Sequence, residues 1–230
     1  MKHGTVIIKL ENVWKTYKMG DVEVNALRGM NFSVRHGEFV VLMGPSGSGK
    51  STAINMIGCL DVPTKGDIYL EHRNIAHLSE SSLAQIRGKK IGFIFQQFNL
   101  IPTLTAKENI MLPMVFQGIA SHKRTLRAEK LLELVDLSDR MDHKPTELSG
   151  GQQQRVAIAR ALANDPEVVI ADEPTGNLDS KTGDLIIRLL LDLHIKENKT
   201  IVMVTHDAHV AKYAERIEHL KDGIIIKKGG

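Results

Sequence analysis

Apolar runs rich in valine and isoleucine recur along the chain and alternate with helical patterns. The runs are "FVVLM" at 39–43, "IGFIF" at 91–95, "VVIA" at 168–171 and "TIVMV" at 200–204. Strands that are apolar on both faces belong to parallel sheets that helices cover. Amphipathic helical stretches lie between them, at 50–60, 124–136, 150–164 and 180–196. The alternation predicts an α/β protein with a mostly parallel core sheet flanked by helices.

Two other parts of the chain have a different pattern. Residues 6–17 and 24–34 mix polar and apolar positions, which predicts antiparallel strands, and residues 67–75 are a further candidate. The sequence from about 97 to 165 is rich in helical patterns and interrupts the series of strands. We therefore expect one domain, residues 1–230, in which a core and an antiparallel β part (about 1–96 and 166–230) carry an inserted helical subdomain (about 97–165).

Composition excludes several classes of function. Lys and Arg number 30 against 27 Asp and Glu, and no basic run stands out, so nucleic-acid binding is not expected. The apolar runs are far shorter than the ~18 residues that a membrane span needs, so we expect no direct insertion into lipid. Cys59 is the single cysteine, which excludes a cysteine-based metal cluster and is typical of a small buried hydrophobe. These features favour a soluble, cytoplasmic protein.

Polar residues follow each of the four apolar runs. The first run leads into Gly44, the second into Gln96, the third into Asp172 and Glu173, and the fourth into His206. In open α/β sheets, ligands bind at the carboxyl ends of the strands. We therefore expect these residues to share one edge of the sheet and to handle phosphate.

A glycine-rich phosphate loop stands between a predicted strand and a predicted helix. The stretch "GPSGSGKST" comprises Gly44, Pro45, Ser46, Gly47, Ser48, Gly49, Lys50, Ser51 and Thr52. Glycines allow backbone N–H groups to approach phosphate oxygens closely. Lys50 is expected to reach the β- and γ-phosphates of a nucleotide, and the Ser51 hydroxyl to ligate Mg²⁺. An ordinary turn with an exposed lysine would not require the strand–loop–helix context.

The acids at the end of the third run suit the same chemistry. With a phosphate loop present, Asp172 is the expected anchor of Mg²⁺, and Glu173 is expected to face the γ-phosphate and an attacking water. His206 follows a buried strand, which favours a functional role, although Asp207 could simply cap the next helix. Tyr17 could stack on adenine or pack in the N-terminal sheet, and the residues alone favour neither.

A second glycine pair opens another predicted helix without a lysine. In "LSGGQ" (Leu148, Ser149, Gly150, Gly151 and Gln152), Ser149 and Gln152 fit a capping box. Glycine in a helix costs about 1 kcal/mol relative to alanine. The glycines leave N–H groups accessible at the positive end of a helix, which suits a second anion. A chain with one phosphate loop has use for such a site if it caps the nucleotide of a neighbour.

The motifs "GPSGSGKST", "LSGGQ" and "VVIADEP" resemble those of the nucleotide-binding subunits of ABC transporters, over nearly the whole chain. The resemblance implies the P-loop NTPase fold of an ABC ATPase, with ATP and Mg²⁺ as cofactors. It implies that Tyr17 stacks on adenine and that Gln96 ligates Mg²⁺ and senses the transport subunit. It also implies that Asp172 anchors the metal and that Glu173 is the catalytic acid–base residue.

Further roles that the resemblance implies concern a dimer. Residues 148–152 resemble the signature that binds ATP across a dimer interface, and Asp179 lies in the loop that crosses between subunits. His206 resembles the residue that senses the γ-phosphate. That crossing loop usually has Ser-Ala before Leu-Asp, and here it has Gly176 and Asn177.

Within the family, the chain resembles the LolD/MacB/FtsE branch in "IGCLDVPTKGDIYL" and "QQFNLIPTLTAKENIMLP". The resemblance implies an ATPase that forms a homodimer on ATP and drives an integral-membrane permease for lipoprotein release or for export of macrolides or peptides. MacB is fused to its permease, whereas this chain resembles a stand-alone subunit, on the inner face of the membrane through its permease.

The sequence leaves two alternatives open, one for the function and one for a group of apolar residues. An ABC ATPase could regulate a permease-like partner in cell-wall or division signalling without transport. ABC proteins of DNA repair or translation share the motifs but carry coiled coils, zinc modules or a second cassette; the sequence shows none of these, which disfavours that function. A group of apolar residues after Gln96 could contact the permease or fill the helical subdomain; it comprises Phe98, Leu100, Ile101 and Leu104.

Overall fold

The computed structural model describes residues 4–226, which form two compact units. The first unit comprises residues 1–87 and 198–230, of which 1–3 and 227–230 lie outside the described residues, and the second comprises residues 88–197. The expected helical subdomain, about 97–165, falls inside the second unit. The ends of the expected domain, 1 and 230, lie outside the described residues.

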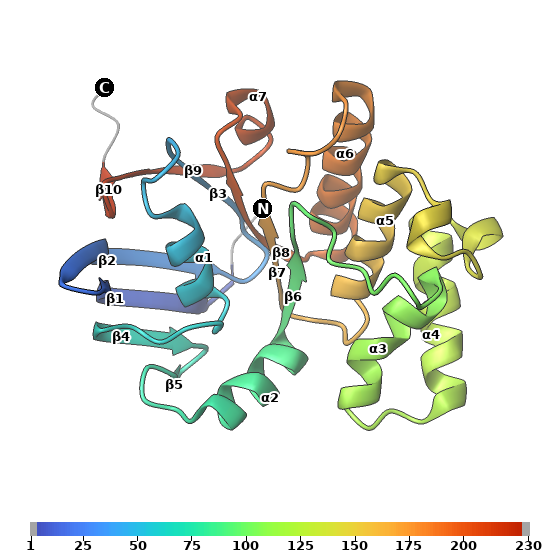
Figure 1. The fold of residues 1–230 in the computed structure, drawn as a ribbon, viewed down its shortest axis with the longest axis horizontal. Coiled ribbons are helices and arrows are strands. Elements are labelled where there is room, and N and C mark those ends of the chain that lie inside the picture. The colour runs from blue at the N-terminus through green and yellow to red at the C-terminus, as the bar shows by residue number, and fades with distance from the viewer. Residues whose placement is uncertain (1–3, 227–230) are drawn as a thin grey trace. The chain divides into compact units, whose positions relative to one another are not determined.

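The first unit contains an antiparallel sheet of the order β2-β1-β4-β5, drawn in blue to teal in Figure 1. Its strands are β1 (Val6–Met19), β2 (Val22–Arg35), β4 (Lys65–Leu70) and β5 (Arg73–Asn74). In the second half of β2 the alternate residues Met30, Phe32 and Val34 are buried, while Asn31 and Arg35 face solvent. This alternation is the one that the mixed sequence pattern predicted.

A second group of strands in the first unit is built around β3. The strand β3 pairs in parallel with β8 and β9, and β10 pairs antiparallel with β9. The bounds are β3 (Phe39–Met43), β8 (Thr200–Thr205), β9 (Arg216–Lys221) and β10 (Ile224–Ile226). Every residue of β8 is buried, as its unbroken apolar run predicts.

The helices of the first unit are α1 (Lys50–Ile57), the short α7 (Ala208–Ala211) and most of α2 (Glu80–Lys90), which contains the boundary between the units. Cys59 follows α1 and is buried, and burial raises the pKa of its thiol to about 12. Its expected role as a small buried hydrophobe agrees with this position, because a thiol with so high a pKa is unreactive at neutral pH.

The second unit combines a pair of parallel strands with helices. The strands are β6 (Ile91–Ile94) and β7 (Val168–Asp172). The α-helices are α3 (Ala106–Phe116), α4 (Ser121–Leu134), α5 (Gly150–Ala161) and α6 (Ser180–Glu197), and the 3₁₀-helices are η1 (Ser138–Arg140) and η2 (Pro145–Glu147). α3, α4 and α5 contact one another, and α5 also contacts β6 and α6.

Close backbone packing joins α5 to β6. A Cβ on Gly92 of β6 would lie 2.3 Å from the carbonyl oxygen of Ala161, which only a glycine avoids. No helix among the described residues is long and apolar enough to cross a membrane.

Candidate functional site

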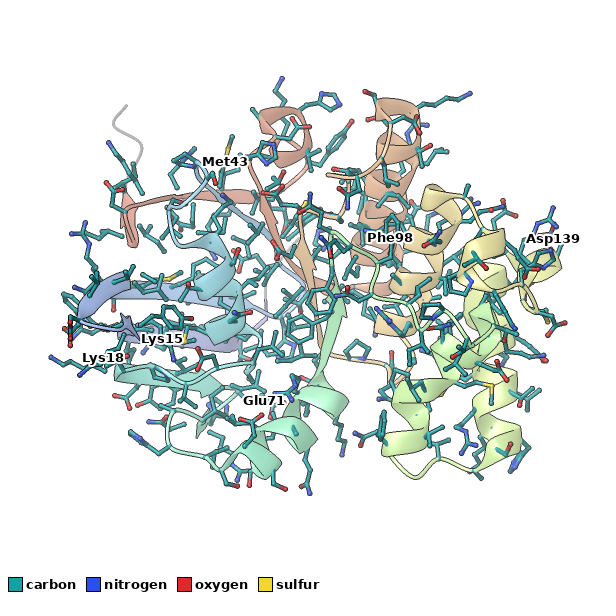
Figure 2. All side chains as sticks on the ribbon, in the orientation of Figure 1. Lys15, Lys18, Met43, Glu71, Phe98 and Asp139 are labelled. Atoms are coloured by element: carbon teal, nitrogen blue, oxygen red, sulfur yellow. The ribbon has the colours of Figure 1, made fainter. Side chains whose placement is uncertain are left out.

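The phosphate loop connects β3 to α1 in the first unit, and Met43, labelled in Figure 2, is the last residue of β3. Two glycines of the phosphate loop are required because other backbone atoms lie too close for a Cβ. A Cβ on Gly44 would lie 2.3 Å from the Leu220 carbonyl oxygen, and one on Gly49 would lie 2.5 Å from the Ala26 carbonyl oxygen. Gly49 also has φ 101°, a conformation that residues with a Cβ rarely adopt. The loop is therefore held against the backbones of two other strands.

The opposite face of the loop is open. Gly47 has φ 77°, and a Cβ there would meet no atom within 4 Å. Gly49 is the N-cap of α1 and provides no side-chain hydrogen bond, and the first turn of α1 contains no acid. The first N–H groups of a helix point along its axis and carry partial positive charge. An anion can thus be bound by the backbone here.

Lys50 adds a full positive charge to this helix terminus. The side chain is only 8% exposed, and its Nζ donates hydrogen bonds to the carbonyl oxygens of Gly44 and Pro45, both at 2.9 Å. The hydroxyl of Ser48 is buried and has no partner among the described residues. A buried ammonium, an unpartnered hydroxyl and an uncapped helix fit the phosphates of a nucleotide.

Tyr17 belongs to a small polar cluster on the antiparallel sheet. Its hydroxyl donates to the Asp61 carboxylate at 3.3 Å, and the Lys15 ammonium lies 5.2 Å from its ring centroid and 2.7 Å from the same carboxylate. A cation at this distance from an aromatic ring is attracted to it. The ring is half-buried and held at its hydroxyl, so its orientation is defined before any ligand binds.

His206 follows β8, in the same unit as the phosphate loop. Residues 43 and 205 are paired neighbours in the parallel ladder, so β3 and β8 end at the same edge. The expected cap is also present: the Asp207 carboxylate accepts from the His209 N–H at 2.7 Å. The side chain of His206 is exposed, which leaves its imidazole accessible to a ligand.

In the second unit, β6 and β7 bring Gln96 and Asp172 to one edge. The parallel register pairs Ile94 with Ala171, so the residues that follow both strands emerge together. The Asn177 amide donates to the Gln96 carbonyl oxygen at 2.8 Å, and the Gln96 amide reaches the Asn177 side-chain oxygen at 3.4 Å. A Cβ on Gly176 would lie 2.7 Å from the Gln96 side chain, so the variant Gly176–Asn177 pair fits against Gln96.

Glu173 stands in an unusual backbone conformation directly after Asp172. Its φ is 45°, in the left-handed region that costs a non-glycine residue about 1–3 kcal/mol. The Gly176 N–H donates to its carbonyl oxygen at 3.0 Å and closes a turn. Strain of this kind persists where surrounding contacts impose it, and it gathers at functional sites.

The signature opens α5 with the expected capping box. The Ser149 hydroxyl accepts from the Gln152 N–H at 3.3 Å, and the Ser149 N–H donates to the Gln152 side chain at 2.8 Å. A Cβ on Gly151 would lie 2.4 Å from Cγ2 of Thr182, so this glycine also has a packing reason that the sequence did not indicate. Leu148, just before the cap, is buried.

Asp179 immediately precedes α6, in the same unit as the signature. Its carboxylate accepts from the Thr182 N–H at 3.0 Å, and the hydrogen bonds from Thr182 lower the pKa of this carboxyl. The residue is exposed and stays ionised at neutral pH. The negatively charged carboxylate is therefore accessible to a positively charged or hydrogen-bond-donating group.

The assignment of Ser51, Gln96 and Asp172 as Mg²⁺ ligands stays a prediction, and it rests on the chemistry of their oxygen atoms. The Ser51 hydroxyl, the Gln96 amide oxygen and the Asp172 carboxylate are hard ligands of the kind that Mg²⁺ prefers, usually together with phosphate oxygens and water. Within residues 4–226, no group of three or more His, Cys, Asp or Glu side chains is arranged to hold a metal ion.

Two polar residues of α5 with close contacts were missed from the sequence. The buried Gln154 donates to the Pro174 carbonyl oxygen at 2.6 Å. Arg160, whose pKa burial lowers, donates to the carbonyl oxygens of Phe98 and Asn99, which have φ values of 38° and 50°. For Gln154 a signal was available in the sequence, since Gln154, Ala157, Ile158 and Ala161 share one face of the helix.

None of the four apolar residues predicted after Gln96 is fully buried. Phe98, labelled in Figure 2, is half-buried, as are Leu100 and Leu104, and Ile101 is exposed. Contact with a permease stays a prediction for this group.

Comparison with known proteins identifies the family. The profile of the ABC transporter family matches residues 27–176. The chain belongs to the ABC transporter family.

Relatives of this ABC protein agree over most of its length. The ABC transporter ATP-binding protein MJ0796 of Methanocaldococcus jannaschii is 55% identical over 94% of each chain. A solved structure described as a dimeric post-hydrolysis state of the ATP-binding cassette MJ0796 bound to ADP and Pi covers 97% of this chain and 100% of its own, with 51% identity and a TM-score of 0.89.

The macrolide export ATP-binding/permease protein MacB of Brucella melitensis is 46% identical over 97% of this chain, which spans 34% of MacB. The predicted ABC ATPase fold and the resemblance to the branch that includes MacB are thus confirmed. The chain is an ATPase that uses ATP and Mg²⁺, as its family does.

Proposed function

We propose that the chain forms a head-to-tail homodimer on binding ATP and that closure and reopening of this dimer drive a membrane permease. The observation that carries the proposal is the second helix opening, in which Ser149, Gly150 and Gly151 present an anion-binding terminus without a lysine. The dimeric state that is described for MJ0796, at 51% identity, supports it.

In this proposal the residues of one chain divide between two nucleotides. Lys50 and the backbone of residues 44–52 bind the phosphates, and Tyr17 stacks on the adenine. The signature, residues 148–152, and Asp179 act on the nucleotide that the partner holds. A helix terminus needs no side-chain charge of its own to bind an anion, which explains the missing lysine.

Hydrolysis requires a metal and a base. Ser51, Gln96 and Asp172 would hold Mg²⁺, which neutralises charge on the phosphates. Glu173 would accept a proton from the attacking water, and this transfer would make the water oxygen more nucleophilic. His206 would donate a hydrogen bond to the γ-phosphate and so report its presence. After the γ-phosphate leaves, the dimer loses contacts that held it closed, which couples hydrolysis to conformation.

The permease would be of the lipoprotein-release type or of the type that exports macrolides or peptides, and it would hold the cassette at the inner face of the membrane. Support comes from the MacB relative, which is named a macrolide export ATP-binding/permease protein. The exposed Ile101 and its neighbours after Gln96 are the proposed contact with the permease.

The shared site can be tested by mixing two inactive variants. Ser149→Arg blocks the signature, and Glu173→Gln removes the base; each alone should abolish hydrolysis. In a mixed dimer, one site combines both defects, and the other pairs an intact phosphate loop and Glu173 with an intact signature. With random assortment in a two-fold dimer, about half the dimers are mixed and about half their sites are intact, so about a quarter of the parent activity should return.

The mixing curve decides between a shared site and a site within one chain. A maximum near equal amounts supports the shared site, and the value drops below a quarter if closure requires both sites. An inactive mixture at every ratio would contradict the shared site, since a signature that acts within its own chain allows no recovery. Ser138→Arg, at an exposed position outside α5, is the control for added charge.

A further inference from the structure

Gln154 is a fully buried amide on α5, with 0% of its surface exposed. Its Nε2 donates a hydrogen bond of 2.6 Å to the carbonyl oxygen of Pro174. Because a carbonyl oxygen only accepts, the orientation of the amide is fixed: Nε2 faces Pro174, and Oε1 points elsewhere.

The free oxygen of this amide is a cost to the fold. Oε1 is buried and has no hydrogen-bond partner among residues 4–226. A buried acceptor without a partner destabilises the folded state, because it has lost its hydrogen bonds to water. An apolar side chain of the same length would avoid that cost and would match Ala157 and Ile158 on the same face of the helix, both 0% exposed. Stability therefore does not account for an amide at this position.

The turn that Gln154 contacts contains Glu173. The φ of 45° at Glu173 is unfavourable for any residue with a Cβ, and the proline that follows restricts the residue before it toward extended conformations. One hydrogen bond, from the Gly176 N–H to the Glu173 carbonyl, closes the turn. The bond from Gln154 holds the next carbonyl, that of Pro174. The carbonyl of Glu173 itself and that of the next residue, Pro174, thus each accept a hydrogen bond.

We propose that Gln154 is a positioning residue that holds Glu173 in its strained conformation through the Pro174 carbonyl. Without this bond, the turn can relax toward the extended region and carry the Glu173 carboxylate away from its water. Since α5 begins at the signature, Gln154 also ties this turn to the helix that would engage the partner's nucleotide. The inference rests on the proposed function, in which Glu173 is the base.

The first test compares two amides, of which Gln154 is fully buried and Asn164 is half-buried. Gln154→Met keeps the length and apolar volume of the side chain but removes the donor. Asn164→Leu is the matched control in the same unit: its Nδ2 also donates to a proline carbonyl, that of Pro113 at 3.2 Å, and its Oδ1 is also buried without a partner among the described residues.

Steady-state hydrolysis of ATP is measured for both variants. Small misplacement of a reacting group costs up to ~10²-fold in rate, so Gln154→Met should lower kcat by about ten- to a hundred-fold, with KM for ATP unchanged within about two-fold. Asn164→Leu should keep kcat within about two-fold of the parent. Equal losses in both variants, or a kcat near the parent in Gln154→Met, would overturn the proposal.

A double variant separates positioning from loosening. Gln154→Met is combined with Glu173→Gln, and residual hydrolysis is followed in single turnovers of radiolabelled ATP. If Gln154 acts through Glu173, the double variant should hydrolyse ATP at the same slow rate as Glu173→Gln alone. A further loss as large as that in the parent background would overturn the proposal. If Glu173→Gln is itself active, the proposed base is wrong, and the two failures are thereby distinguished.

Folding of the variants is followed by thermal unfolding. Gln154→Asn is the second variant, because its shorter amide keeps the polar group but cannot reach the Pro174 carbonyl, and it should lose kcat as Gln154→Met does. If neither Gln154 variant folds while Asn164→Leu does, the amide serves the fold rather than the turn, and the proposal is wrong.

Discussion

The chain opens two helices with glycines, α1 after the phosphate loop and α5 in the signature, and the two openings are built differently. At α1, the N-cap Gly49 has a left-handed backbone and no capping side chain. At α5, the N-cap Ser149 is extended, with φ −65° and ψ 161°, and its side chain and that of Gln152 cap each other's N–H groups. The first opening therefore leaves its donors to a ligand, whereas the second satisfies donors internally.

The difference in capping determines how each helix opening can bind an anion. At α1, no side chain caps the first N–H groups, and the buried Lys50 adds a positive charge, although its ammonium donates to the Gly44 and Pro45 carbonyl oxygens. This terminus is therefore suited to bind an anion by itself. The capping box makes α5 a complete helix with no ligand present. An engaged phosphate would have to share or replace the contacts of Ser149. That arrangement suits a terminus that meets its nucleotide only when two chains come together.

The glycines of the two openings also have different neighbours. Gly49 is required by a backbone atom, the carbonyl oxygen of Ala26, which cannot be removed by substitution. Gly151 is required by a side-chain methyl group, that of Thr182, which can be removed. The second opening can thus be altered by one substitution and repaired by another.

The largest effect is expected where both openings stay intact and the base is lost. Glu173→Gln should bind ATP normally but hydrolyse it about 10²–10⁴-fold more slowly, since general-base catalysis supplies that range. Phosphate release measures the rate, and gel filtration should show an ATP-bound dimer. Glu133→Gln, on the exposed face of α4, is the matched control. A rate above about a tenth of the parent would exclude Glu173 as the base.

A smaller effect separates the two openings in binding. Lys50→Ala removes a charge-assisted contact of about 1.5–3 kcal/mol, so the Kd for ATP should rise about ten-fold or more. Ser149→Ala should leave the Kd of the isolated chain unchanged, because the signature is expected to serve the partner's nucleotide. Nucleotide titration at concentrations below dimer formation measures both. Equal weakening in the two variants would contradict the division between the openings.

Gly151→Ala should destabilise the protein through a clash. The added Cβ would lie 2.4 Å from Cγ2 of Thr182, and overpacking of this kind costs about 1–3 kcal/mol. Thr182→Ser removes that methyl group, so the double variant should regain most of the lost stability. Denaturant unfolding measures the free energies. If Thr182→Ser does not repair Gly151→Ala, the methyl group is not what requires the glycine.

The smallest effect is expected at the neighbouring glycine. A Cβ on Gly150 would make ordinary contacts, 3.6 Å to Leu178 and 3.7 Å to Phe98. Alanine is favoured over glycine in a helix by up to about 1 kcal/mol, so Gly150→Ala should leave stability unchanged or raise it slightly. The same unfolding experiment should therefore give opposite signs for Gly150→Ala and Gly151→Ala. A matching decrease in both would show that α5 needs backbone freedom rather than space.

Some elements that the structure contains had no clear pattern in the sequence. In α2, Leu83 is the single buried residue, so no apolar periodicity marks the helix. In strand β9, Leu220 is buried and the other residues are exposed or half-buried, and β10 is very short. These elements form because neighbouring segments pair with them: β9 takes its place beside β3, and β10 beside β9.

The sequence by itself determined the features that depend on neighbours along the chain. The buried strands follow from unbroken apolar runs, the cap at Ser149 from a partner within one helical turn, and the phosphate loop from glycines between a strand and a helix. Only the tertiary structure decided which distant residues meet. The methyl group of Thr182 leaves no room for a Cβ on Gly151. The Pro174 carbonyl accepts a hydrogen bond from Gln154, and the Gln96 carbonyl accepts one from Asn177. Local hydrogen bonds and periodicity can be read from residue order, because their partners are close in the chain. Contacts between segments depend on packing and register, and no local pattern encodes them.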